Sequence, residues 1–424
     1  MMSFPHRLLC LSLAPGVAWA AVLHVGPGKE HATLRGALNA AGAGDTITVH
    51  SGTYREGALL VDKPIQLVGE DWPVLDGEGK YQIVTITAAG VEMSGFEVRN
   101  GGAGSLEDVA GIKVSGTRQA VVRNNRVRNC NFGIYVSKAN ECRILDNDVL
   151  GVQGGAHESG NAIHLWSCEN ITVTGNKVHD HRDGIYLEFA SHSVIEHNLV
   201  GDNLRYGLHY MFSHESTFRH NRFERNGAGV AVMYTRKVDM SFNHFGDNWG
   251  SSAYGLMLKD MSDGRIIGNS FVRNSIAIAM HGSNRMEIEH NLFSGNGWAI
   301  QIQRSSSNNN YRSNNFSGNS FDIAADGELD NNRFEKNYWD KYEGYDLNRD
   351  GTGDVPYRPV SLYAVVVGRI PPSVLLLRSP IVHLLDQAEK AFPSITPERV
   401  VDDAPVMRPH PADTRMANDQ TEKP

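Results

Sequence analysis

The chain has 424 residues, and 40 basic residues stand against 48 acidic ones, so its formal net charge is −8. No basic tract interrupts this slight acidity, which argues against a nucleic-acid partner. The apolar stretch from Val365 to Leu377 is broken by Gly368, Arg369 and two prolines, and no run after the N-terminus approaches the roughly 20 residues of a membrane-spanning helix.

The first 20 residues have the pattern of a secretory signal peptide. His6 and Arg7 precede an apolar run from Leu8 to Val17, and Ala18-Trp19-Ala20 matches an Ala-x-Ala cleavage site. We therefore expect residues 1–20 to be removed and the protein to be exported. Residues 32–41 then predict a short helix that caps the first coil of the next region, since an uncovered coil would leave an open sheet edge.

A short repeat dominates the middle of the chain. Each copy contains Asn-x-(Val, Phe or Leu), a polar stretch, and Gly or Ala before alternating apolar residues, and it returns about every 22 positions. A period this short without helical spacing is typical of a solenoid whose coils stack and share one core. The repeat asparagines are Asn125, Asn147, Asn176, Asn198, Asn221, Asn243, Asn269, Asn291, Asn314 and Asn332.

One coil shows which side chains would form that core. Ile185 and Leu187 alternate with Tyr186 and Glu188, so the first two point inward and the other two outward. This pattern predicts an all-β fold, a right-handed single-stranded parallel β-helix with an N-terminal cap, over residues 21–340. Only three cysteines follow the signal, without Cys-x-x-Cys spacing, so we expect buried coil residues at Cys130, Cys142 and Cys168 rather than a disulfide framework.

The outward positions of successive coils form two columns. The first column is Tyr135, His164, Tyr186, His209, Ala231, Met257, Ala279 and Gln301. The second column is Ser137, Trp166, Glu188, Met211, Met233, Lys259, His281 and Gln303. Because neighbouring strands lie about 4.8 Å apart, His209, Met211, Met233 and Met257 would form one patch on the solvent side.

This patch is rich in soft metal ligands. Thioether and imidazole groups suit monovalent copper. We therefore predict a copper site, for Cu(I), at His209, Met211, Met233 and Met257, flanked by His164 and His281. The alternative is that these side chains pack under a loop or against a partner subunit, as methionine does at adaptable interfaces.

A second candidate metal site follows the coils, in residues 341–360. Oxygen-bearing residues alternate there and a glycine stands at the sixth position, as in an EF-hand-type calcium loop, but the twelfth position is Tyr357 rather than an acid. The sequence predicts a structural calcium site, with a metal-free turn as the alternative. The candidate ligands are Asp346, Asn348, Asp350, Thr352 and Asp354.

Residues 361–400 are apolar and punctuated by proline. Ser379 and Pro380 predict the N-cap and first residue of a helix, on which Ile381, Leu384, Leu385, Ala388 and Phe392 share one face. This face either caps the open end of the solenoid, the interpretation we favour, or docks onto another protein. Residues 401–424 are polar enough to form a disordered tail.

Four long segments together resemble the NosD family. They run from His179 to Tyr186, Leu204 to His214, Gly227 to Tyr234, and Tyr338 to Pro359, and the resemblance covers nearly the whole mature chain. The bare asparagine repeat, in contrast, would fit many carbohydrate-active β-helices.

The resemblance implies a periplasmic, non-catalytic protein with a pectin-lyase-like β-helix. Members of the family serve the maturation of the copper sites of nitrous oxide reductase, together with an ABC transporter, made of a permease and an ATPase, and a copper chaperone. It also implies that contact with the membrane occurs only through the permease. The choice of copper ligands above comes from the columns and not from a family motif.

Two other functions remain open at this level. Polysaccharide lyases and epimerases share the fold, which does not decide function, and Asp180, Arg182, Asp183, Glu188 and Arg205 could form an acid–base set on adjacent coils. The protein could also be a scaffold that holds the reductase without touching metal.

Overall fold

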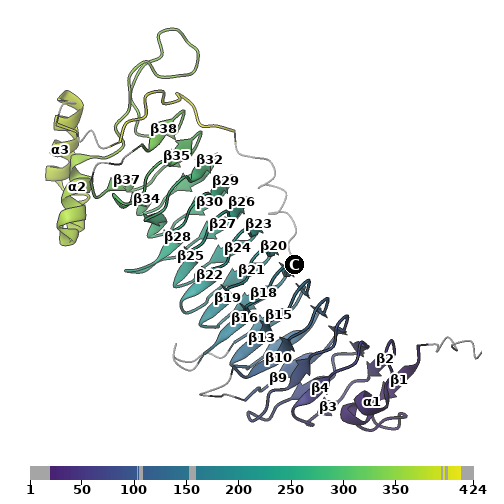
Figure 1. The fold of residues 1–424 in the computed structure, drawn as a ribbon. Coiled ribbons are helices and arrows are strands. Elements are labelled where there is room, and N and C mark those ends of the chain that lie inside the picture. Colours follow the sequence, from purple (N-terminus) through teal and green to yellow (C-terminus); the bar gives the residue numbers. More distant parts are fainter. Residues whose placement is uncertain are drawn as a thin grey trace, which may run out of the picture.

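The computed structural model describes residues 20–411 except residues 103, 105–107, 152–158, 328, 330, 393–394 and 397–399. The chain winds into a parallel β-solenoid with three sheets, which confirms the predicted fold class (Figure 1). Most of the proposed signal peptide, the tail beyond residue 411, and residues 152–158 within the Gly-rich segment 151–160 lie outside the described residues. None of the helices described is long and apolar enough to cross a bilayer.

Each complete coil contributes one strand to each sheet, the coils at the two ends contribute fewer, and all pairs between these strands are parallel. The 14-stranded sheet A contains β1 (Val22–Val25), β2 (Thr46–Val49), β5 (Gln66–Gly69), β8 (Glu92–Ser94), β11 (Val121–Arg123), β14 (Arg143–Leu145), β17 (Thr172–Thr174), β20 (Val194–Glu196), β23 (Thr217–Arg219), β26 (Asp239–Ser241), β29 (Arg265–Ile267), β32 (Glu287–Glu289), β35 (Asn310–Arg312) and β38 (Arg333–Glu335).

The 13-stranded sheet B contains β3 (Thr53–Tyr54), β6 (Val74–Asp76), β9 (Glu97–Arg99), β12 (Arg126–Arg128), β15 (Asp148–Leu150), β18 (Lys177–His179), β21 (Leu199–Gly201), β24 (Arg222–Glu224), β27 (His244–Gly246), β30 (Ser270–Val272), β33 (Leu292–Ser294), β36 (Asn315–Ser317) and β39 (Tyr338–Trp339).

The 12-stranded sheet C contains β4 (Leu59–Val61), β7 (Val84–Ile86), β10 (Ala110–Ser115), β13 (Phe132–Ser137), β16 (Asn161–Trp166), β19 (Asp183–Glu188), β22 (Tyr206–Met211), β25 (Ala228–Met233), β28 (Tyr254–Lys259), β31 (Ile276–His281), β34 (Trp298–Ile302) and β37 (Phe321–Ala325). Its strands are mostly longer than those of the other two sheets, so it offers the widest outer face.

The core is a set of stacked inward-facing side chains. Ile185, Leu187, Leu208 and their counterparts are fully buried, as the alternation predicted. The three cysteines are buried and unpaired. An aromatic stack with ring centroids 4.1–5.5 Å apart runs through the later coils, formed by Phe223, Phe245, Phe271, Phe293, Phe316 and Trp339.

The repeat asparagines form a continuous hydrogen-bonded ladder inside the solenoid. In a typical step the backbone N–H and the Nδ2 group of Asn221 both donate to Asn243 Oδ1 at 3.0 Å. After Asn314 the next member of the ladder is Asn337, whereas our repeat listed Asn332 at this position. Asn332 accepts from Asn309 instead and belongs to a different turn. Buried amides that bond along the axis fix the register of successive coils.

A second ladder, which sequence reasoning missed, runs parallel to the first. Its members are Asn203, Asn226, Asn248, Asn274, Asn296 and Asn319.

The two ends of the solenoid are covered by different devices. At the N-terminus, α1 (Leu34–Ala40) packs Leu34, Ala37 and Leu38 onto the first coils, where the capping helix was expected. At the other end, residues 400–411 lie along β38 and β39, and His410 exchanges two hydrogen bonds with Asn315. Residues 401–411 are therefore ordered, where we expected a disordered tail from residue 401 onward. Pairing with strands far away in the sequence stabilises this segment despite its polar composition.

The C-terminal helices do not cover the open end. α2 (Leu362–Arg369) packs Tyr363, Ala364 and Val367 against Phe321 and Trp298, so it covers the outer face of sheet C at its last strands. The 3₁₀ helix η1 (Pro371–Leu376) links it to α3 (Pro380–Ala391), which begins after Ser379 as predicted. The capping interpretation of the apolar face of α3 was wrong, because Ile381, Leu384 and Phe392 are exposed.

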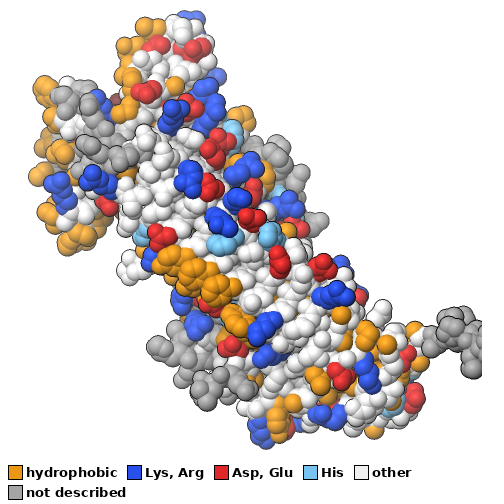
Figure 2. Space-filling model, in the orientation of Figure 1, with side chains coloured by type: hydrophobic (Ala, Val, Ile, Leu, Met, Phe, Trp, Pro, Cys, Tyr) orange, Lys and Arg blue, Asp and Glu red, His pale blue; other side chains and the backbone are white. Residues whose placement is uncertain are grey.

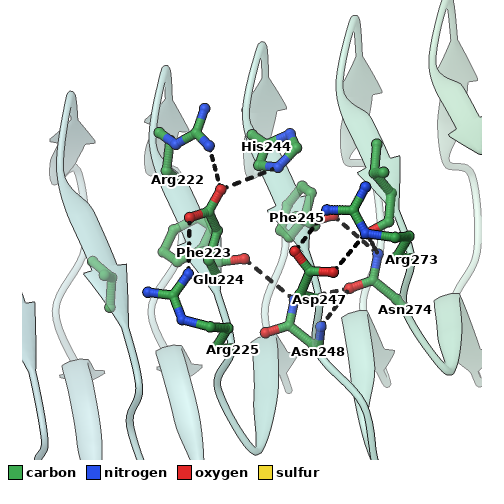
Figure 3. A network of polar contacts seen from close by, with 12 residues as sticks. Arg222, Phe223, Glu224, Arg225, His244, Phe245, Asp247, Asn248, Arg273 and Asn274 are labelled. Atoms are coloured by element: carbon green, nitrogen blue, oxygen red, sulfur yellow. Dashed lines mark hydrogen bonds and ion pairs between the residues drawn. The ribbon is translucent and has the colours of Figure 1, made fainter. Parts of the chain in front are cut away.

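Ion pairs tie neighbouring coils together on the outer face of sheet B (Figure 3). Glu224 contacts Arg222 on its own strand, and a ring nitrogen of His244 on the next strand lies 3.3 Å from its carboxylate. Arg273 makes a two-bond contact with Asp247 at 2.7 and 2.8 Å. The hydrogen bond from His244 and the positive charge of Arg222, against the opposing effect of burial, together lower the pKa of Glu224 to about 2.

This shift predicts a specific acid sensitivity. The Glu224 carboxyl titrates near 4.5 when unperturbed and at about 2 in the folded protein, so its contribution to stability is present above pH 4.5 and is lost as the pH falls toward 2. We expect Glu224→Gln to flatten the decline of the melting temperature in that window. Thermal unfolding followed at half-unit pH steps measures this. Identical pH profiles for the variant and the wild type would contradict it.

Candidate functional site

The outer face of sheet C carries the two predicted columns in the predicted register. His209 pairs with Ala231 and Met211 pairs with Met233, and the next rung places Met257 beside Ala231 and Lys259 beside Met233. The same register extends back through Tyr186, His164 and Tyr135 and forward through Ala279 and Gln301. A slip by one residue, which would have turned every one of these side chains inward, does not occur.

Four of the six predicted copper ligands surround one small residue. Ala231 lies between His209 and Met257 in the first column, while Met211 and Met233 stand beside it in the second column. The short side chain of Ala231 leaves room between the imidazole of His209 and the thioether of Met257 within the first column.

The first column is buried although it points away from the core. His209 is 3% exposed and Met257 is 8% exposed, whereas we expected both on the solvent side. Tyr206, Tyr254 and Ile276 pack with Met233 over Ala231, Met257 and Ala279 and exclude water from them. The patch is therefore a shallow apolar layer on the outside of the solenoid.

A third outward column, which sequence reasoning missed, supplies this cover. It lies at the first residue of each strand: Asp183, Tyr206, Ala228, Tyr254, Ile276 and Trp298. Gly or Ala follows each of these residues, and a Cβ atom on Gly207 would lie 2.7 Å from the Gly229 carbonyl oxygen. The recurring small residue was visible in the repeat and could have signalled that the residue before it also faces outward.

His209 lies in an unusual polar environment. Its Nδ1 atom is 3.6 Å from Asp183 Oδ2, which is longer than a hydrogen bond, and Asp183 is 1% exposed. Neither ring nitrogen of His209 has a hydrogen-bond partner among the residues described. The ring stacks on Tyr186 at 4.5 Å and meets Tyr206 at 4.8 Å between centroids. A buried imidazole without partners is costly unless a ligand or ion completes it.

Met211 is fixed by its neighbour on the preceding rung. The Tyr186 hydroxyl donates to Met211 Sδ at 3.4 Å. This contact positions the thioether at the exposed margin of the patch, next to the buried His209. Methionine alone is flexible, so the hydrogen bond limits the conformations that Met211 can adopt.

His164 and His281 do not join the four central residues. The Tyr186 ring stands between His164 and His209, with centroid distances of 4.8 and 4.5 Å. Lys259 stands between His281 and Met233 in the second column, and His281 lines a cleft of about 490 Å³ beside α2. Burial lowers the pKa of His164 to about 3, with a smaller effect of Arg182, so its imidazole is neutral.

An aromatic shelf borders the patch. We use this name for Phe189, Phe212 and Tyr234, which directly follow the second-column strands and stack at 5.2 and 5.1 Å. Phe189 is 52% exposed, and Lys259 lies over the Tyr234 ring. Figure 2 shows an apolar stripe across the middle coils, at the place where Figure 1 draws β19, β22 and β25. Exposed stacked aromatic rings of this kind mark interaction surfaces.

The acid–base set considered for a lyase comes together only in part. Asp183 is buried beside Arg205, with 3.6 Å between the nearest atoms, while Asp180 bonds His179 at 3.0 Å. Arg182 donates to Asn161. Asp183 and Arg205 thus meet across adjacent coils, whereas Asp180 and Arg182 contact residues outside the set.

The predicted calcium loop is closed by its own side chains. Asp346 Oδ2 accepts from the Gly351 N–H at 2.8 Å, and Asp350 Oδ1 accepts from the Thr352 N–H at 2.7 Å. Gly351 has a φ of +90°, which suits glycine. In the part of the chain that the structure describes, no three His, Cys, Asp or Glu side chains are placed together to hold a metal ion. A metal site among the described residues would thus use thioether ligands, or no more than two of these side chains, or require a rearrangement.

Comparison with known proteins gives consistent matches. Residues 150–344 match the family model described as periplasmic copper-binding protein (NosD). The chain is 31% identical over 406 residues to a Pseudomonas aeruginosa protein named probable ABC transporter binding protein NosD, covering 85% of this chain and 87% of that protein. A protein of the same name from Stutzerimonas stutzeri is 29% identical over 375 residues, covering 84% and 86% of the two chains.

Solved structures add information on the fold alone. The catalytic unit of an α-1,3-glucanase from Streptomyces thermodiastaticus superposes with a TM-score of 0.56 at 14% sequence identity, covering 70% of this chain and 64% of that chain. At this identity the likeness shows a shared β-helix and carries no information on activity.

Proposed function

Because the chain belongs to the NosD family of periplasmic copper-binding proteins, we propose that it accepts and presents Cu(I) as cargo for assembly of the copper sites of nitrous oxide reductase. The observation that carries the proposal is the patch of His209, Met211, Met233 and Met257 on adjacent strands. Thioether sulfur and neutral imidazole are ligands that favour monovalent copper over the harder divalent ions.

The burial of the patch supports a role in transfer. His209 and Met257 are shielded, while Met211 and Met233 are partly exposed at the margin. An ion that reaches the exposed thioethers first can therefore pass to the buried imidazole by exchange of ligands on one face. We propose that the copper chaperone and the reductase dock on the aromatic shelf, since its exposed rings lie next to Met211 and Met233.

The C-terminal helices offer a separate surface for the membrane components. Leu375, Ile381, Leu384 and Phe392 are exposed and apolar at the end of the solenoid. Relatives are named as ABC transporter binding proteins. We propose that this surface docks on the transporter permease, whose ATPase drives release, and that membrane contact occurs only through that permease.

Calcium binding by the loop from Asp346 to Asp354 stays a prediction. A bound ion would stabilise the loop, whose Gly353 N–H donates to the Pro405 carbonyl.

Copper loading of the reductase in cells tests the function. Replacing Met211, Met233 and Met257 together by leucine keeps the apolar volume and removes the sulfur atoms. We expect cells with this variant to produce reductase without its full copper content, measured as metal per purified enzyme, as in cells that lack the protein. Full copper content with the variant but not in cells lacking the protein would identify a metal-free scaffold. Full copper content in both would refute the role.

The carbohydrate-active alternative is tested separately. The fold is compatible with it, and uronate polymers incubated with the mature protein would show unsaturated or epimerised products. We expect none, because Asp183 is buried against Arg205, while Asp180 and Arg182 are engaged by His179 and Asn161.

A further inference from the structure

Two histidines and a glutamate meet on the first coils, far along the chain from the methionine patch. His24 lies on β1, while His50 and Glu70 directly follow β2 and β5, the next two strands of sheet A. His24 Nδ1 is 3.0 Å from His50 Nε2, and His50 Nδ1 is 3.0 Å from Glu70 Oε2. Figure 1 places this end of sheet A away from β22, β25 and β28.

The backbone holds both imidazoles in place. The His50 N–H donates to Val25 O at 2.9 Å, and the His50 carbonyl accepts from the Tyr54 hydroxyl at 2.8 Å. The His24 carbonyl accepts from the His31 N–H at 3.0 Å. The two rings stack with centroids 5.2 Å apart. This pair is thus set by the sheet rather than by a mobile loop.

The distance between the two nitrogens is the informative quantity. At 3.0 Å the atoms share one proton in the metal-free protein, and the same spacing suits two neighbouring ligands around one metal ion, which lie about 2.0–2.1 Å from it. Glu70 bonds the far nitrogen of His50 and fixes the tautomer that directs Nε2 toward His24. A carboxylate behind a ligating histidine is a common outer-shell arrangement in metal sites.

We propose that His24 and His50 form a site for a divalent transition-metal ion, Cu²⁺ above all, with Glu70 as a positioning residue. Binding requires His24 to change tautomer: its Nδ1 proton leaves and its Nε2 atom takes up a proton from solvent, so both rings stay neutral and His24 Nδ1 and His50 Nε2 take neighbouring positions around the ion. Imidazole suits copper and zinc, and divalent copper binds nitrogen sites more tightly than the other first-row ions do. The remaining positions face water, because His24 is exposed.

This site is independent of the proposed Cu(I) patch. Its ligands are imidazoles without thioether, and they lie on sheet A rather than on sheet C. A negative result for Cu²⁺ at His24 and His50 would not argue against Cu(I) binding at the methionine patch. A negative result at the patch would likewise not argue against the histidine site.

Electron paramagnetic resonance of the mature protein with one equivalent of Cu²⁺ in citrate buffer tests the proposal. Citrate ligates through oxygen only, so nitrogen couplings report protein nitrogen, and the histidine variants show whether it is imidazole. We expect a spectrum with two coupled nitrogens and an affinity that falls at least tenfold in His24→Gln and in His50→Gln. His383→Gln, which removes an exposed histidine on α3, is the matched control and should change nothing.

Glu70→Gln separates positioning from ligation. It keeps both imidazoles, so we expect the two-nitrogen spectrum to persist with an affinity reduced by about 10-fold, the lower end of outer-shell effects. Thermal unfolding without metal should show the same melting temperature for all four variants within about 2 °C, which excludes misfolding. A wild-type spectrum without two coupled nitrogens, or an affinity unaffected by both His24→Gln and His50→Gln, overturns the site.

Discussion

A protein with Met211, Met233 and Met257 all replaced by leucine will bind Cu(I) at least about 100-fold more weakly than the wild type. Losing one outer-shell partner already costs 10–100-fold in metal affinity, and this variant removes three sulfur ligands at once. Leucine fills nearly the same volume, and Met257 packs with Ala231 and Ala279 in an apolar layer that leucine also suits. The fold should therefore survive while the ligands disappear.

Anaerobic competition against a calibrated chromophoric chelator measures this affinity. Met240→Leu is the matched control, because Met240 lies inside the solenoid and is fully buried there. We expect the control to compete like the wild type. His209→Asn is a second variant for the same competition measurement. It removes the buried imidazole and keeps a small polar group beside Asp183. If the triple variant competes as well as the wild type, the patch is not the copper site.

The second large effect is expected at the C-terminal end of the asparagine ladder. Asp402 Oδ2 accepts from the backbone N–H of Asn337 at 3.2 Å, from its Nδ2 group at 3.0 Å, and from Trp339 Nε1 at 3.0 Å. Asp402 is fully buried. Asp402→Ala leaves these buried donors without an acceptor, and each unsatisfied group costs about 1–3 kcal/mol. We expect opening of the last coil to become easier by about 3 kcal/mol.

Hydrogen exchange is the appropriate measurement, because a solenoid opens from its ends and global unfolding would dilute the effect. Amides of β38 and β39 should exchange roughly 100-fold faster in Asp402→Ala, and amides of β19 should not change. Asp402→Asn keeps an acceptor oxygen. Burial raises the pKa of the Asp402 carboxyl, so loss of its charge is tolerated and Asp402→Asn should show a smaller change. Equal protection in Asp402→Ala and the wild type would refute the capping role.

The asparagine ladder shows where sequence reasoning stops. The sequence contains both Asn332 and Asn337, and we placed Asn332 in the repeat, 18 residues after Asn314. Stacking decides for Asn337, because only that side chain lies over Asn314 on the next coil. Likewise nothing local in residues 401–411 indicates order, since their partners Asn315, Lys336 and Asn337 precede them by 65 residues or more.

The candidate site divides in the same way. Successive residues of a strand face opposite sides, so alternation along the strand determines which way each side chain points. The two columns therefore followed from the sequence, and so did the proximity of His209, Met211, Met233 and Met257. Burial depends on side chains from other coils. Only the tertiary structure shows Tyr206 and Tyr254 covering the first column, Asp183 beside His209, and His24 beside His50. The local period determines direction, while packing between distant residues decides exposure and chemical environment.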